Sequence, residues 1–134
     1  MSAMAAVHQA IYTRLSNDAP LAAAGFDVFD EPPPLSYGGS YIVIGDGTET
    51  TGPGSHSARA WEGTETLHIW AKGNSTLMAR QALELVRDAM ESTRLNVAGH
   101  STMWCRLEFS MVMKEPGWRH IPARFRIITG SALP

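Results

Sequence analysis

Histidines are the side chains of this 134-residue sequence best suited to acid–base or metal chemistry. There are five of them: His8, His56, His68, His100 and His120. No two have the H-x-x-x-H spacing that turns two imidazoles of one helix toward a metal ion. His68 alternates with Leu67 and Ile69, which favours a structural histidine over a ligand. We therefore expect no metal ion and no cofactor.

The other reactive side chains also lack a catalytic arrangement. Glu62 and Glu65 lie three residues apart on a predicted strand and therefore face opposite ways, which is poor geometry for an acid–base pair. No Gly-x-Ser-x-Gly elbow is present. Cys105 alternates with apolar residues, as a small buried hydrophobe does. The sequence thus predicts no enzyme. The enzymatic alternative is a small active site that uses His68 or His100, and it requires a deep pocket that gathers them.

Length and composition predict a single domain over residues 1–134. The chain is 44 % hydrophobic and 18 % charged, which is too apolar for a disordered chain. No apolar run approaches the roughly 20 residues of a membrane span, and the start of the chain lacks the basic region of a signal peptide. The only cysteine, Cys105, excludes an internal disulfide. We expect a soluble domain with no membrane contact, made in the cytoplasm.

Charge is distributed unevenly along the chain. The net charge of -2 argues against a general nucleic-acid binder. Residues 18–65 contain eight acids and one base, whereas residues 66–134 contain nine bases and five acids. Either folding interleaves the two halves, or the subunit has two unlike surfaces that pair head to tail.

Hydrophobic periodicity predicts an α+β fold, in which an antiparallel or mixed β-sheet packs against two α-helices and one long polar loop projects. Met4, Val7, Ile11 and Leu15 form the core stripe of the first helix. On the second helix the predicted core face is Met78, Ala82, Leu85, Val86 and Ala89. The expected segments are helices to about residue 15 and over 75–92, strands at 27–30, 40–44, 61–71, 103–113 and 121–127, and an exposed loop over 45–59.

Two features favour an interaction protein. Trp70 and Trp104 fall opposite the apolar rows of their strands, so either both faces of the sheet are covered or one face meets another subunit. The polar stretch 46–58 is long for so small a domain. It is either a docking loop or a tolerated insertion.

The order of elements resembles that of a known family. The opening segment is AVHQAIYTRLSNDAPLAA, and a VFDEPPP link follows it. The most telling parts are the strand 41–45, the strand 67–70 followed at once by a capped helix, and the closing strand 124–126. Over residues 3–129 the chain is similar to the tail completion, or tail terminator, proteins of long-tailed bacteriophages and phage-like particles. The polar stretch 46–58 departs from that pattern.

The resemblance implies a structural protein of the virion tail, made in the cytoplasm of the host bacterium. It implies a homo-oligomer, a hexameric ring at the head-proximal end of the tail tube. The ring would stop tube polymerisation and join the tail to the head connector or stopper protein, and DNA would pass through the lumen without sequence-specific binding. The expected interface residues are Trp70, Trp104, Trp118, Arg124 and Arg126. The expected docking-loop or lumen residues are Asp46, Glu49, Thr50, His56, Glu62 and Glu65.

A third class of function is also compatible with the sequence. A stand-alone adaptor domain would bind a peptide by adding a strand to a sheet edge. Monomeric behaviour at high concentration would favour the adaptor over the ring.

Overall fold

The N-terminal helices follow from the apolar stripe and from a cap. In the computed structural model, which describes residues 3–51 and 60–131, α1 (Met4–Ser16) buries Val7, Ile11 and Leu15. These are three of the four residues of the predicted stripe, and the fourth, Met4, is partly buried against the core. Asp18 accepts a hydrogen bond of 3.1 Å from the backbone N–H of Leu21 and so caps the short α2 (Ala19–Ala23).

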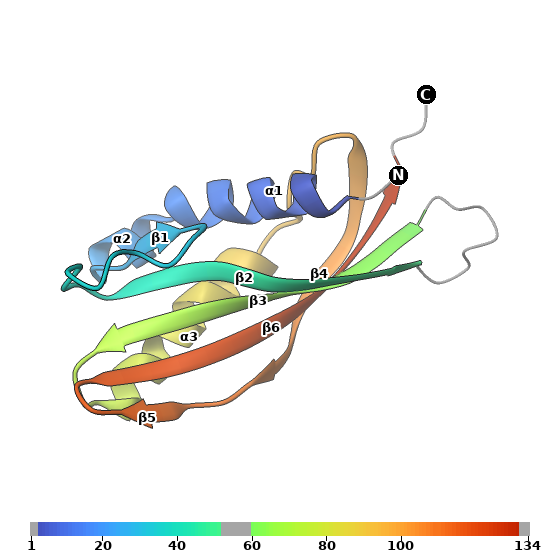
Figure 1. Ribbon diagram of the computed structural model, residues 1–134. Coiled ribbons are helices and arrows are strands. Elements are labelled where there is room, and N and C mark those ends of the chain that lie inside the picture. Colours follow the sequence, from blue (N-terminus) through green and yellow to red (C-terminus); the bar gives the residue numbers. More distant parts are fainter. Residues whose placement is uncertain (1–2, 52–59, 132–134) are drawn as a thin grey trace.

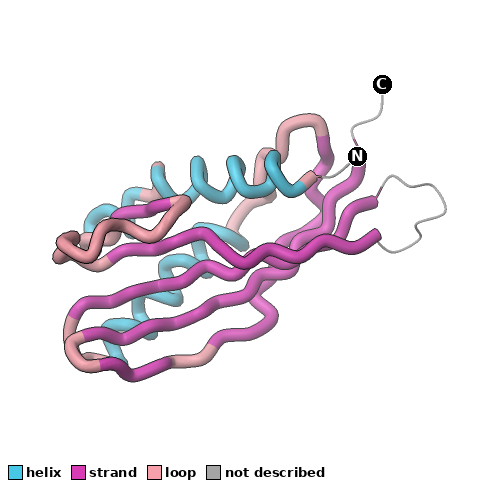
Figure 2. Tube along the Cα trace, viewed as in Figure 1, coloured by secondary structure: helices cyan, strands magenta, loops and turns pink. Residues whose placement is uncertain are grey.

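Six strands form one mixed sheet, which confirms the predicted fold class. They are β1 (Asp27–Phe29), β2 (Tyr41–Thr51), β3 (Ala60–Lys72), β4 (His100–Ser110), β5 (Met113–Glu115) and β6 (Trp118–Ser131). The order across the sheet is β1-β2-β3-β6-β4, and β5 also pairs with β6. Only the β1–β2 pair is parallel, and the other pairs are antiparallel. Figure 2 shows the strands in magenta and the helices in cyan.

The second long helix, α3 (Thr76–Glu91), begins at Ser75, whose hydroxyl accepts from the backbone N–H of Met78 at 3.1 Å. Its buried residues are Ala79, Ala82, Val86, Ala89 and Met90. The predicted core face was therefore wrong at Met78, which is 63 % exposed. The buried stripe passes through the alanine beside it, where a small side chain lets the helix approach the sheet closely.

The core lies on one face of the sheet. Leu67 and Ile69 of β3 and Ile121, Ala123 and Phe125 of β6 point to this face and are completely buried. Both α1 and α3 pack into the same cluster, and Figure 1 shows α3 behind β3 and β6. Within the described residues no helix covers the opposite face. Coverage of the sheet on both sides, one of the two explanations for the exposed tryptophans, is thereby excluded for this part of the chain.

The predicted loop over 45–59 was wrong at its start, because β2 continues to Thr51. A bulge at Asp46, whose φ is 57°, shifts the register between Gly45 and Gly47, and pairing with β3 then resumes. The hydroxyls of Thr48 and Thr64 lie 2.6 Å apart across the two strands. Residues 52–58 of the predicted docking loop, His56 among them, lie outside the described residues.

The alternation predicted over 103–113 is not one strand. Register shifts between Thr102 and Trp104 and between Leu107 and Phe109 interrupt β4. Each bulge moves the following side chains to the other face. Cys105 therefore remains in the core, whereas Phe109, at 46 % exposed, does not.

Candidate functional site

The face of the sheet that no described helix covers is the candidate site, and we call it the uncovered face. β3 contributes His68 and Trp70 to it, and β6 contributes His120, Arg124 and Arg126, since these residues are in register with one another and out of phase with the buried rows. The face divides into an aromatic part and a charged part.

Two histidines and one carboxylate form a hydrogen-bonded chain in the first part. Nε2 of His68 lies 2.9 Å from an Asp46 carboxylate oxygen, and Nδ1 of His68 lies 2.9 Å from Nε2 of His120. The His120 ring stacks on Trp70 at 4.0 Å between centroids. Burial, together with the neighbouring His68, lowers the pKa of His120 to about 4. The His120 ring is therefore neutral at pH 7 and acts as a packed aromatic surface.

Five aromatic rings continue this packing across β1, β2, β3 and β6. Tyr41 stacks on Trp70 at 6.1 Å and meets Trp118 edge to face at 5.9 Å. Phe29 and Tyr37 close the group, 5.2 Å apart. All five are half-buried in the isolated subunit. They give this part of the uncovered face a rigid, partly apolar surface of the kind enriched in protein interfaces.

The charged part is a ladder of ion pairs. Glu108 accepts a hydrogen bond of 2.7 Å from Arg126 and another of 2.7 Å from Arg124. Arg126 also bonds Glu62 on β3, and the Arg124 guanidinium lies over the Phe109 ring at 5.2 Å. The hydrogen bonds from Arg126 and then from Arg124 hold the pKa of Glu108 below its usual range. The ladder is preformed in the single subunit.

The predicted interface residues thus fall on one face of the sheet. Trp70 and Trp118 lie in its aromatic part, and Arg124 and Arg126 lie in its charged part. Trp104 is on β4, opposite Ile128, and is 36 % exposed. That another subunit covers these residues is a proposal, which is argued below.

The predicted lumen residues do not form one group. Asp46 and Glu49 are exposed, although the Glu49 carboxylate also accepts from the Trp61 indole N–H. Glu62 is on the uncovered face, paired with Arg126. The backbone of Thr50 pairs with that of Glu62 across β2 and β3.

Glu65 differs from the other acids because its side chain points to the core face and is only 4 % exposed. It lies against Gly47 and Met4: a Cβ on Gly47 would come within 2.8 Å of Glu65 Oε1 and 3.0 Å of Met4 Cε. Burial, and secondarily the charge of Asp46, raises the pKa of Glu65 to about 7. The sequence contained a signal for this burial, because Glu65 is in phase with Leu67 and Ile69.

The structure separates the residues of the enzymatic alternative. His68 is opposite Pro122 of β6, whereas His100 of β4 is opposite Ser131 at the far end of β6. Nine residues of strand between these positions amount to roughly 30 Å. In the described chain no three histidine, cysteine or acidic side chains lie close enough to hold a metal ion. None of the described helices has the length and apolarity to cross a bilayer.

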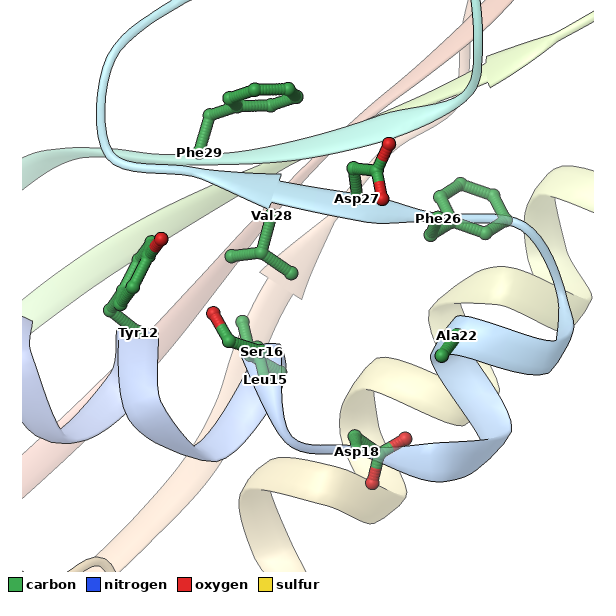
Figure 3. Close-up of a pocket in the computed structure, with 9 residues that line it drawn as sticks. All are labelled: Tyr12, Leu15, Ser16, Asp18, Ala22, Phe26, Asp27, Val28 and Phe29. Carbon is green, nitrogen blue, oxygen red and sulfur yellow. The ribbon is translucent and has the colours of Figure 1, made fainter.

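A groove of about 380 Å³ lies between α1, α2 and β1 (Figure 3). Val28 points into it toward Leu15, whereas Phe29 points to the other side of the strand. Its two carboxylates have structural partners: Asp18 caps α2, and Asp27 accepts from the Tyr37 hydroxyl. The residues that line the groove include no histidine, cysteine or lysine.

Comparison with solved structures gives the fold a context. One chain of the "Virion of native gene transfer agent (GTA) particle" superposes with a TM-score of 0.79 at 20 % identity, covering 97 % of this chain and 98 % of that one. The bacteriophage SPP1 gp17 protein superposes with a TM-score of 0.60 at 21 % identity, covering 91 % of this chain and 87 % of that one. At such identities the likeness concerns the fold alone. No curated protein sequence matches the chain.

The sequence itself matches a described family over most of its length. The sequence profile of the family "Tail completion protein gp17" covers residues 9–130. This range includes α2, α3, β1 to β5 and all of β6 except Ser131. The chain therefore belongs to the tail completion protein gp17 family, whose members are structural, non-enzymatic components of virion tails.

Proposed function

We propose that this chain forms a ring, a hexamer, at the head-proximal end of the tail tube, where it stops tube polymerisation and joins the tail to the head connector or stopper protein. The family match over residues 9–130 is the observation that carries the proposal. Its place in the particle would be the head–tail junction, after synthesis in the cytoplasm of the host bacterium.

The uncovered face supports the proposal. A ring brings unlike surfaces of neighbouring subunits together, and each subunit then needs surface that packs only after association. Trp70, Trp104 and Trp118 supply aromatic area, and Arg124 and Arg126 supply planar cations on a preformed ladder. We assign these five residues to the interface with another subunit or with a neighbouring tail protein.

The lumen assignment depends on charge. A conduit for DNA needs a surface that does not bind phosphate, and carboxylates repel it. Asp46 and Glu49 are exposed acids of β2, and Glu62 lies on the neighbouring strand β3, opposite Thr50. We assign these three to the lumen, with Thr50 and His56 in the adjoining segment. Glu65 is left out of the assignment because its carboxylate is buried.

Electron microscopy of particles made with and without the chain tests the function. Without it, we expect tails of irregular length and heads without tails, and we expect the wild-type gene supplied in trans to restore joined particles. Purified protein should show closed rings under negative stain. Particles that join normally without the chain would refute the proposal. A strictly monomeric protein at high concentration would favour the adaptor alternative.

A further inference from the structure

The two edges of the sheet lie on opposite sides of the subunit and differ in chemistry. β1, with the link that follows it, forms one edge, and β4 with β5 forms the other. Figure 1 shows the β1 link and β5 at the same end of the sheet, on opposite margins. Two different patches placed in this way can join copies head to tail, and such contacts close into a ring when the rotation between copies allows it.

The first patch is the tip of the link between β1 and β2, residues 30–36, which we call the Leu35 knob. Leu35 is fully exposed, the most exposed of the large hydrophobic residues described. Three prolines precede it and stiffen the backbone. Lys72 Nζ donates to the Gly38 carbonyl at 2.7 Å and holds the base of the link. A leucine held in water at the tip of a stiff link is suited to insertion into a partner.

The second patch runs along the opposite edge, from Phe109 through Met111 to Met113, and we call it the methionine edge. These side chains are 46 %, 47 % and 40 % exposed. Phe109 and Met113 lie opposite Arg124 and His120 of β6, so the patch spans about 13 Å at 3.3 Å per residue. Methionine side chains are flexible and adapt to an inserted leucine.

The two patches carry charges of opposite sign and are therefore electrostatically complementary. The knob includes Asp30 and Glu31, both exposed, and residues 30–36 contain no base. Arg106 and Lys114, both exposed, flank the methionine edge. Two acids also border this edge: Glu108 is already paired with Arg124 and Arg126 of its own subunit, and Glu115 lies 3.9 Å from His120. Opposite charges around apolar centres fix partner and orientation.

We infer that the Leu35 knob of one copy of this chain docks on the methionine edge of the next copy, with its acids beside Arg106 and Lys114. The occupant of the edge is thus a second copy of the same chain. The inference deepens the proposed function, on which it rests, by naming the two surfaces that meet in the ring.

The test uses two defective variants, each with a matched control. Leu35→Ser removes the knob, and Leu77→Ser makes the same change at an α3 residue that is 67 % exposed and belongs to neither patch. Met111→Glu places an acid on the edge, and Met78→Glu is its control at a residue 63 % exposed. Sedimentation velocity measures assembly, and circular dichroism with thermal melting confirms that each variant folds.

We expect both control variants to assemble like the wild type, and Leu35→Ser and Met111→Glu each to remain monomeric at the concentration where the wild type forms rings. An equimolar mixture of these two monomers should give dimers only, because one intact edge meets one intact knob and each dimer then lacks further binding surface. Rings formed by either defective variant, or a mixture that stays monomeric, would overturn the pairing and leave the ring itself standing. A wild type that never associates would overturn both.

Discussion

Glu65→Gln should make the stability of this chain less dependent on pH. Glutamine keeps the size and the polar end of the protonated acid but cannot ionise. The wild-type carboxyl has a pKa of about 7 in the folded chain, raised mainly by burial, and 4.5 is its ordinary value. Folding therefore favours the protonated form of this side chain.

The sign follows from proton binding. Below pH 4.5 the carboxyl is protonated in both states, and its environment costs the fold nothing. Between pH 4.5 and pH 7 the folded chain keeps a proton that the unfolded chain has released, so wild-type stability falls as the pH rises. At roughly 1.4 kcal/mol per pH unit, this amounts to up to about 3 kcal/mol above pH 7.

Urea unfolding followed by circular dichroism at pH 4.5, 6, 7 and 8.5 measures the effect. The difference in unfolding free energy between Glu65→Gln and the wild type should be near zero at pH 4.5 and should grow to about 3 kcal/mol in favour of the variant at pH 8.5. Glu84→Gln, an exposed change on α3, is the control and should run parallel to the wild type. A difference that does not change with pH, or a variant less stable at pH 8.5, would refute the reasoning.

Three further changes probe the core and the charged ladder. The Cys105 thiol, whose pKa burial raises to about 12, should resist alkylation by iodoacetamide at pH 8 until urea unfolds the chain, as mass spectrometry would show. Phe125→Ala, at a completely buried ring, should cost about 3–5 kcal/mol in urea unfolding, and a loss below 1 kcal/mol would contradict the assigned core. Reversal of Arg124 and Arg126 to Glu should weaken association, measured by light scattering, because acids would then replace the two cations that pair with Glu108. The remaining association should depend less on salt, and the monomer should stay folded. An unchanged, salt-independent signal would count against this interface.

The strands in which apolar residues alternate without a break could be predicted from the sequence. Ile121, Ala123 and Phe125 alternate without interruption, and they form the buried row of β6. Trp70 and Trp104 were placed opposite such rows by the same alternation, and both lie on the uncovered face. Where one face of a regular strand is buried, the spacing of its apolar residues is sufficient to predict which side chains point to the core.

Bulges and long-range pairing were not predictable from the sequence. The polar end of β2 is held by its partner strand rather than by apolar residues of its own, so Thr48 gave no strand signal. A single extra residue before Phe109 turned the rest of an apolar alternation out of the core. The contact between His68 and His120 joins residues 52 positions apart, and only the register of β3 with β6 creates it.

The pairing of β3 with β6 also sets the order in which the chain can fold. Ala60 pairs with Gly130, and Lys72 with Trp118, so the middle of the sheet joins residues from distant parts of the chain. High contact order of this kind slows folding, because the entropy lost in closing a long loop precedes the stabilising contacts that the closure allows. β6 follows every other described element along the chain and lies between β3 and β4 in the sheet. The two sides of the sheet are therefore joined only after β6 has been synthesised. β4 and β5 both pair with β6, so the methionine edge that they form is ordered only when β6 is in place.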